Sequence, residues 1–202
     1  MKLGFLASGA GTNMQVVIDA CKEGRLQAKP VVVIGNNSRS DALTRARGEQ
    51  IPSFHLSSHT NRNAEDLDLT IKSVLCDHGV DLVCLAGYLK LLGPRTLQKY
   101  KGRILNIHPA LLPKYGGRGF YGKAVHQAVI DAGEKETGAT IHLVDEIYDH
   151  GAVISQVKVP VMPGDTADIL AGRVLRQEHK LYTETLQKIV SGKIDLSFYA
   201  RA

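Results

Sequence analysis

Short apolar runs alternate with stretches of helical spacing through the first half of the chain. The apolar runs, which are typical of buried strands, cover residues 2–7, 31–34, 53–56, 82–87 and 104–108. Between them, apolar side chains recur every three or four residues over 14–20, 42–50 and 64–78. The run at 82–87 is apolar throughout, as in a central parallel strand covered on both faces. This alternation predicts βαβ units on a parallel sheet.

The pattern changes after residue 108. A glycine-rich loop over 114–122 precedes a predicted helix at 124–132, strands at 140–144 and 153–161, and a long helix at 166–191. The last two strands are joined by only a few residues, 145–151, which is compatible with an antiparallel hairpin. We therefore predict an α/β fold in a single domain over 1–202, a doubly wound, mostly parallel, Rossmann-like sheet with an antiparallel edge.

Composition narrows the class of protein without identifying it. The 202 residues suffice for one well-packed domain, and 44% apolar with 22% charged residues is usual for a soluble protein. The net charge of +5 is dispersed and suits small anionic ligands at least as well as nucleic acid. With only 5% aromatic residues, a nucleic-acid binder is the last of the alternatives, and we expect no nucleic-acid partner. Three cysteines form no disulfide or metal-ligand pattern, and the longest apolar run, 82–89, is too short to span a membrane. These features predict a cytoplasmic protein with no membrane partner.

The segment 104–113 carries the residues best suited to chemistry. Pro109 cannot donate a hydrogen bond to a strand ladder, so the apolar strand before it should end near His108. Asn106 and His108 are two residues apart in that strand and therefore share one face. An amide and an imidazole side by side can stabilise an oxyanion during acyl transfer.

A second candidate site is the loop at 8–13, which follows the first strand and contains Gly9 and Gly11. Glycines let the backbone approach an anion, and the following helix start adds free N–H groups and a positive dipole end. Met14 stands where a dinucleotide fingerprint would have its third glycine, and residues 35–37 lack the expected acidic residue. The loop therefore predicts a phosphate or mononucleotide site instead of a dinucleotide site.

Taken together, these motifs resemble a known family. The stretch from Asn106 to Pro113, followed later by Asp149 and Gly151, is similar to the signature of the folate-dependent formyltransferases. The loop at 8–13 and the helix segment 173–179 resemble, among these, the phosphoribosylglycinamide formyltransferases. The likeness extends from residue 2 to about residue 194. It implies transfer of a formyl group from 10-formyltetrahydrofolate, a co-substrate, to the amine of 5-phosphoribosylglycinamide (glycinamide ribonucleotide) in de novo purine biosynthesis.

The resemblance also implies roles for individual residues. Asn106 and His108 would stabilise the tetrahedral intermediate, His108 would also donate a proton, and Asp149 would orient His108. No metal is implied. The residues implied to bind the ribonucleotide are Gly11, Thr12 and Asn13 at its phosphate and Glu178 at its ribose. The residues implied to bind folate are Arg62, Tyr88, Leu89, Lys90, Leu91, Leu92, Asp145, Glu146, Ile147 and Tyr148.

The resemblance divides the predicted domain into a phosphate-binding half, 1–100, and a folate-binding and catalytic half, 101–202. Three features depart from the family pattern. The loop at 114–122 is richer in glycine and aromatic residues, Lys90 stands where arginine is common, and Leu175 replaces a frequent polar residue. The sequence leaves the oligomeric state open, and a homodimer is one of the options.

Rival interpretations differ in what else the chain should contain. An enzyme that formylates methionyl-tRNA would be expected to carry an extra carboxy-terminal domain, whereas this sequence ends at Ala202. A sugar-nucleotide formyltransferase would share the same catalytic side chains. A hydrolase that releases formate from the folate would be expected to carry an amino-terminal regulatory domain. A phosphate-binding module without catalysis would explain the loop at 8–13 and leave Asn106, His108 and Asp149 without a role.

Overall fold

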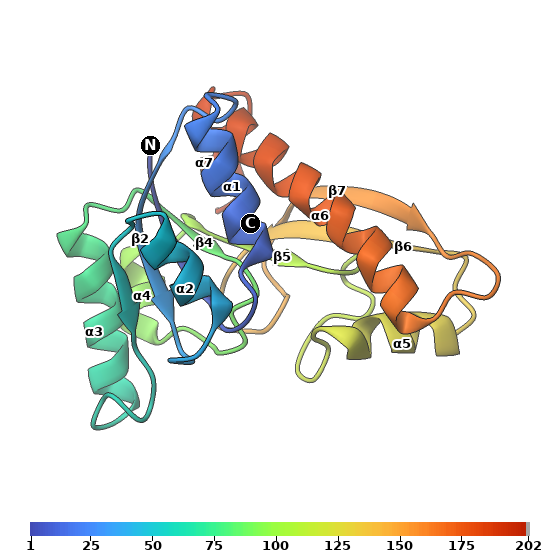
Figure 1. Ribbon diagram of the computed structural model, residues 1–202, viewed down its shortest axis with the longest axis horizontal. Coiled ribbons are helices and arrows are strands. Elements are labelled where there is room, and N and C mark those ends of the chain that lie inside the picture. Colours follow the sequence, from blue (N-terminus) through green and yellow to red (C-terminus); the bar gives the residue numbers. More distant parts are fainter. Residues whose placement is uncertain (201–202) are drawn as a thin grey trace.

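A seven-stranded sheet forms the centre of the computed structural model, which describes residues 1–200 (Figure 1). The strands are β1 (Lys2–Ala7), β2 (Lys29–Gly35), β3 (Ser53–His55), β4 (Leu82–Leu85), β5 (Ile104–His108), β6 (Glu136–Leu143) and β7 (Val153–Pro160). Their order across the sheet is β3-β2-β1-β4-β5-β6-β7. Neighbours from β3 to β5 pair in parallel, while β5–β6 and β6–β7 pair antiparallel. The predicted mostly parallel sheet with an antiparallel edge is confirmed. Residues 201–202 of the predicted domain lie outside the described residues.

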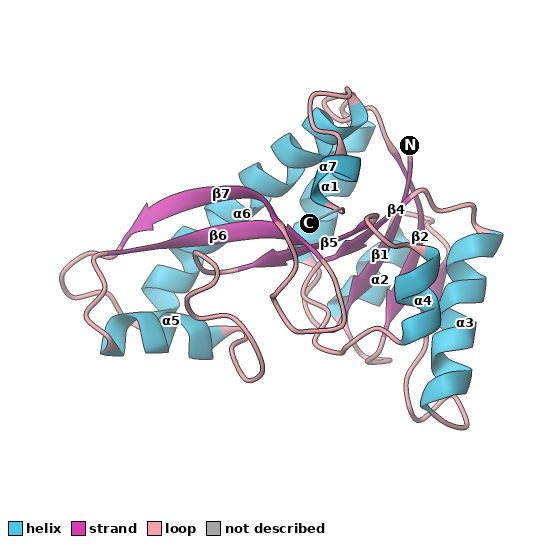
Figure 2. Ribbon diagram, turned by 180° about the vertical axis from the view of Figure 1, so that it is seen from behind, coloured by secondary structure: helices cyan, strands magenta, loops and turns pink. Residues whose placement is uncertain are grey.

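Helices cover both faces of this sheet. They are α1 (Thr12–Lys22), α2 (Asp41–Gly48), α3 (Ala64–Asp77), α4 (Pro94–Lys99), α5 (Lys123–Asp131), α6 (Ala167–Val190) and α7 (Leu196–Tyr199). Figure 1 shows α1, α2 and α6 on the near face, and Figure 2, from behind, shows α3 and α4 on the other. This arrangement is the doubly wound fold that the alternation of strands and helices predicted.

Alternating side chains of β1 supply two separate cores. Leu3 and Phe5 are fully buried in one apolar cluster with α1, α2 and α6, while Leu6 is fully buried in the other with α3. A strand covered by helices on both faces needs apolar residues at every position, which explains the unbroken apolar run. Among the helices of residues 1–200, none is long and apolar enough to cross a membrane.

The structure extends two predicted strands, β2, which begins two residues early at Lys29, and β6, where the change is larger. β6 begins at Glu136, four residues before the predicted start, because its first residues pair with β7 from Glu136 opposite Pro160 onward. The added residues include Gly138, where a Cβ would clash with the carbonyl oxygen of Val157. Cross-strand pairing, and not an apolar run, therefore defines the beginning of this strand.

Two short helices, α4 and α7, were not predicted. α4 has six residues, too few to show an apolar repeat, although Pro94 at its first turn is a usual start signal. Its first N–H groups are capped from another helix, since the buried carboxylate of Asp68 accepts hydrogen bonds from the N–H of Arg95 at 2.8 Å and of Thr96 at 3.0 Å. A long-range cap of this kind has no local sequence signal.

The antiparallel part of the sheet brings polar side chains together beside β5. In the β5–β6 ladder, Asn106 lies opposite His142, and His108 lies opposite Thr140. Directly opposite residues of an antiparallel pair point to the same face. The strands β6 and β7 continue away from the parallel part, with α5 and α6 beside them (Figures 1 and 2). The crevice between these two parts holds the site described next.

Candidate active site

A cavity of about 880 Å³ lies at the carboxyl ends of β1, β4 and β5, where a doubly wound sheet usually binds its ligands. The predicted site residues that line it are Asn13, Tyr88, Leu89, Lys90, Leu91, Leu92, Asn106, His108, Asp145, Ile147, Tyr148, Asp149 and Glu178. Residues from both halves of the chain thus meet around one space. Its volume is within the range usual for small-molecule sites.

Four polar side chains form a cluster on one wall of the cavity. The amide nitrogen Nδ2 of Asn106 lies 3.1 Å from Nε2 of His142 and 3.4 Å from Oδ1 of Asp149. The other carboxylate oxygen of Asp149, Oδ2, lies 3.5 Å from Nδ1 of His108. We call Asn106, His108, His142 and Asp149 the polar cluster. It contains the three residues that the sequence assigned to catalysis.

Asp149 is held in the polar cluster by its backbone and its carboxylate. Its φ of +54° is unusual for a residue other than glycine, and Oδ2 accepts a hydrogen bond from the N–H of Gly117 at 2.9 Å. Burial alone would raise the pKa of Asp149, but the neighbouring imidazoles of His142 and His108 and the hydrogen bond from Gly117 outweigh it and lower the pKa below its usual value. The group is therefore an anion at neutral pH.

His108 is almost fully buried, and both ring nitrogens have neighbours. Its Nε2 lies 2.7 Å from the backbone carbonyl oxygen of Tyr115, which can only accept, so Nε2 carries a hydrogen. Burial lowers the pKa of His108; the Asp149 carboxylate and the Tyr115 carbonyl oppose this shift without cancelling it. The ring is thus a hydrogen-bond donor of fixed orientation whose proton affinity depends on Asp149.

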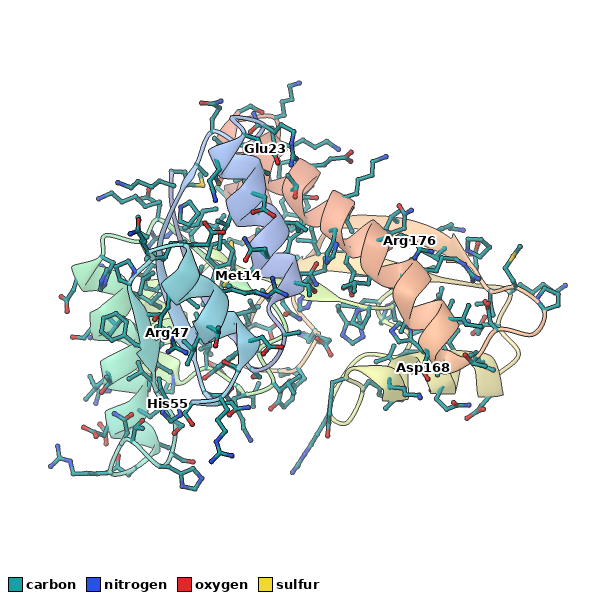
Figure 3. The ribbon with its side chains drawn as sticks, viewed as in Figure 1. Met14, Glu23, Arg47, His55, Asp168 and Arg176 are labelled. Atoms are coloured by element: carbon teal, nitrogen blue, oxygen red, sulfur yellow. The ribbon has the colours of Figure 1, made fainter. Side chains whose placement is uncertain are left out.

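At the helix start beside the cavity, the predicted phosphate loop contacts Glu178, the carboxylate predicted to bind the ribose. Gly11 caps α1 with φ +67°, and the Nδ2 of Asn13 donates to Oε2 of Glu178 at 2.9 Å. Burial raises the pKa of Glu178, and the hydrogen bond from Asn13 only partly opposes that shift. Met14, fully buried at the start of α1 (Figure 3), packs in the core where a dinucleotide site would need a glycine. The geometry suits a single phosphate with a sugar beside it.

Four predicted ligand residues do not line the cavity. Gly11 and Thr12 form the helix start just behind its wall, and Glu146 is exposed on the loop after β6. Arg62 is exposed before α3, with its guanidinium 3.4 Å from the carboxylate of Asp66. Their roles as ligand contacts stay predictions.

Three groups beside the cavity were not predicted from the sequence. His142 lies two residues after Thr140 in a strand, the same spacing as Asn106 and His108, and that spacing was the available signal. His126 of α5 is buried and lines the cavity, and its Nδ1 has no hydrogen-bond partner in the described part of the chain. The carbonyl of Tyr115 depends on a backbone φ of +57°, for which the sequence gives no signal.

Comparisons with known proteins identify the family of the whole chain. The formyl transferase family model matches residues 1–186. The phosphoribosylglycinamide formyltransferase of Haemophilus influenzae is 40% identical over 195 residues, which cover 96% of this chain and 90% of that protein. The crystal structure of glycinamide ribonucleotide transformylase 1 from Symbiobacterium toebii has a TM-score of 0.90 at 36% identity, covering 96% of this chain and 90% of that one.

A second solved structure is matched over its whole length. The phosphoribosylglycinamide formyltransferase of Bacillus halodurans has a TM-score of 0.89 at 35% identity, with 98% of this chain and 100% of that chain covered. The family match, the sequence identity and the likeness of fold extend over almost the same residues. The chain therefore belongs to the formyl transferase family, among its phosphoribosylglycinamide formyltransferases.

Proposed function

We propose that the chain transfers the formyl group of 10-formyltetrahydrofolate to the primary amine of 5-phosphoribosylglycinamide, a step of purine biosynthesis. The observation that carries this proposal is the polar cluster, in which the amide of Asn106 and the imidazole of His108 both lie within 3.5 Å of the Asp149 carboxylate at the cavity wall. Such a set can support acyl transfer to an amine without a covalent intermediate on the protein.

The chemistry needs an oxyanion site and a route for one proton. The amine nitrogen attacks the formyl carbon, and the carbonyl oxygen becomes an oxyanion. The amide of Asn106 and the protonated Nδ1 of His108 stabilise it by donating hydrogen bonds, since Nε2 of His108 already donates to Tyr115. Collapse of this intermediate breaks the bond to N10 of the folate, which takes up one proton as the new amide nitrogen loses one. His108 donates, and Asp149, an anion beside it, stabilises the charged imidazole and helps the proton to move through water.

The remaining cavity walls suit the two substrates. The phosphate lies at the start of α1, and the ribose hydroxyls lie on Glu178, whose contact with Asn13 joins the two subsites. The pterin lies along residues 88–92 and 145–149. The first of these loops is tied to the phosphate loop, since Oγ of Ser8 accepts a hydrogen bond from the N–H of Leu89 at 2.9 Å. On this proposal, 1–100 and 101–202 act as a phosphate-binding half and a folate-binding and catalytic half.

The proposal also covers partners and compartment. Both substrates are small molecules, and no nucleic acid or membrane is required. The cysteines of residues 1–200 are all free, which supports a reducing compartment, and we place the chain in the cytoplasm. A homodimer is compatible with this assignment and is testable by sedimentation.

The decisive experiment mixes the purified chain with 10-formyltetrahydrofolate and 5-phosphoribosylglycinamide and follows the absorbance of the tetrahydrofolate product. We expect turnover that needs both substrates. Methionyl-tRNA should not react when it replaces the ribonucleotide, and it should not inhibit the reaction when it is added to both substrates. Folate turnover without any acceptor would instead indicate a hydrolase, and efficient tRNA formylation would overturn the proposed acceptor.

Gly11→Ala should raise the KM for the ribonucleotide at least tenfold. The new Cβ would lie 2.7 Å from Cβ and 2.9 Å from Cα of Ala42, and the residue would keep a φ of +67° that glycine favours. The loop and its N–H groups must therefore shift, while the folate subsite stays intact.

Gly24→Ala is the matched control for this change. Gly24 has φ +74° and no heavy atom within 4 Å of an added Cβ, so it tests the backbone effect alone. We expect a slightly lower Tm and an unchanged KM. A similar rise in KM for folate and ribonucleotide in Gly11→Ala would mean general misfolding, contrary to a phosphate site.

Glu178→Ala should raise the KM for the ribonucleotide roughly tenfold or more, because it removes a charged acceptor of ribose hydroxyls. Glu184→Ala, on an exposed part of the same helix, is the control and should behave like the parent. Burial raises the pKa of Glu178, so this carboxylate takes up a proton at a higher pH than an exposed glutamate does. As the pH is lowered, ribonucleotide binding should therefore begin to weaken at a higher pH than an exposed glutamate would allow. Steady-state kinetics measures the KM, and isothermal titration measures ribonucleotide binding at each pH. Unchanged KM and binding in Glu178→Ala would exclude the ribose role.

A further inference from the structure

We infer that His142 is a positioning residue, which fixes the side-chain amide of Asn106 with its NH₂ group toward the reacting carbonyl. This inference deepens the proposed function and rests on it. It concerns a side chain on β6 that no sequence motif marked. His142 lies directly opposite Asn106 across the β5–β6 ladder and is 2% exposed.

The hydrogen-bond partners of His142 determine which nitrogen carries its hydrogen. Nδ1 lies 2.7 Å from the backbone carbonyl oxygen of Leu143, which can only accept. Nδ1 therefore carries a hydrogen, and in the neutral ring Nε2 presents a lone pair. A single contact to the backbone of its own strand thus sets the tautomer of this ring.

That lone pair selects one orientation of Asn106. The two ends of a side-chain amide have nearly the same shape, so packing alone hardly distinguishes them. Nε2 of His142 lies 3.1 Å from Nδ2 of Asn106 and can accept one of its two hydrogens. With the amide reversed, the oxygen of Asn106 would face this lone pair, and the two acceptors would repel each other.

The orientation leaves the second amide hydrogen available for catalysis. Nδ2 lies 3.4 Å from Oδ1 of Asp149, a long contact that a closer acceptor in the cavity can replace. An oxyanion that forms during formyl transfer is such an acceptor. A reversed amide would instead turn its oxygen toward the developing negative charge and would remove the donor that the reaction needs.

Asp149 is the competing partner of His142. Its Oδ1 lies 3.5 Å from Nε2 of His142, and a cationic ring would donate to this oxygen or to the amide oxygen of a reversed Asn106. The two arrangements differ in whether Nε2 carries a hydrogen. The nitrogen chemical shifts of the ring therefore distinguish them directly, without any measurement of activity.

The kinetic test is a double-mutant cycle. His142→Leu should lower kcat roughly tenfold with the KM of both substrates within about twofold, because the ring is 2% exposed and is assigned to hold Asn106 and not a substrate. His142→Gln, whose side-chain oxygen can accept near the position of Nε2, should restore most of the rate. In the Asn106→Ala background, His142→Leu should cost less than about twofold, since the amide that it orients is absent. His78→Leu, on α3's C-terminal side away from the cavity, is the matched control.

The spectroscopic test uses ¹⁵N-labelled protein without substrates. We expect the neutral ring of His142 to carry its hydrogen on Nδ1, and the side-chain NH₂ signal of Asn106 to shift in His142→Leu and return in His142→Gln. An equal loss of kcat in both backgrounds, or a hydrogen on Nε2 at the pH of maximal activity, would overturn the inference. If His142→Leu does not fold, the Gln variant and the spectrum of the parent decide. Absence of formyl transfer by the parent would refute the proposed function and leave the spectroscopic result intact.

Discussion

His108→Ala should lower turnover by roughly a hundredfold or more while the KM of each substrate changes little, as is found when a donor to an oxyanion is removed. Asn106→Ala should have an effect of the same size. Both side chains lie at the cavity wall with their donors fixed, His108 by Tyr115 and Asn106 by its contacts within the polar cluster. Each variant removes an interaction that is strongest in the transition state and weak in the bound substrate.

The measurement is steady-state kinetics with both substrates varied, together with a thermal melt of each variant. His126→Ala, which removes a buried imidazole of the same cavity outside the polar cluster, controls for a mere loss of packing. It should retain most of the turnover of the parent. Near-normal turnover of a folded His108→Ala or Asn106→Ala protein would contradict the proposed mechanism.

Asp149→Asn should lower turnover roughly a hundredfold, because it removes the anion that orients the His108 ring and stabilises its protonated form. The direction of the accompanying pKa change follows from the site. The Asp149 carboxylate raises the pKa of His108 against the effect of burial, so its loss should lower that pKa further. Protonated His108 is then present only at lower pH, and the decline of turnover on the alkaline side should move to lower pH.

Two measurements separate this effect from a structural one. An NMR titration of the His108 ring should show a lower midpoint in Asp149→Asn than in the parent, and the pH profile of kcat should shift in the same direction. Asp131→Asn is the control, since the exposed Asp131 accepts a hydrogen bond from Gln127 at 2.8 Å and does not line the cavity. An unchanged His108 midpoint together with parental turnover would leave Asp149 only the role of a turn residue.

The apolar pattern predicted most of the fold because local burial dictates it. β1 and β5 occur where the apolar runs place them, since nearly all residues of these strands are buried beneath the layers on either side of the sheet. Long amphipathic segments likewise predicted α3 and α6 to within about one residue at each end. The beginning of β6 and the helix α4 were not predictable in this way. Their limits depend on partners far along the chain, β7 for the strand and Asp68 for the helix.

The site residues likewise separate into those that the local sequence predicts and those that depend on distant parts of the chain. Asn106 and His108 were found because both lie in one strand and their alternation can be counted directly. His142 lies 36 residues from Asn106, and its place in the site depends on the antiparallel register of β5 with β6. The carbonyl of Tyr115 carries no side-chain identity at all, so only the folded backbone shows that it faces His108. Glu178 came from family resemblance alone, because a glutamate on a helix is usually solvated.

The ladder of β5 and β6 separates the reaction from the choice of acceptor. Asn106 and His142 are held by backbone hydrogen bonds between two interior strands, whereas the phosphate of the acceptor is assigned to the loop at 8–13, between β1 and α1. Loops tolerate insertion and replacement better than interior strands do. New acceptors could therefore be engineered, or arise in evolution, by exchanging the loop at 8–13 while the strand pair is inherited unchanged.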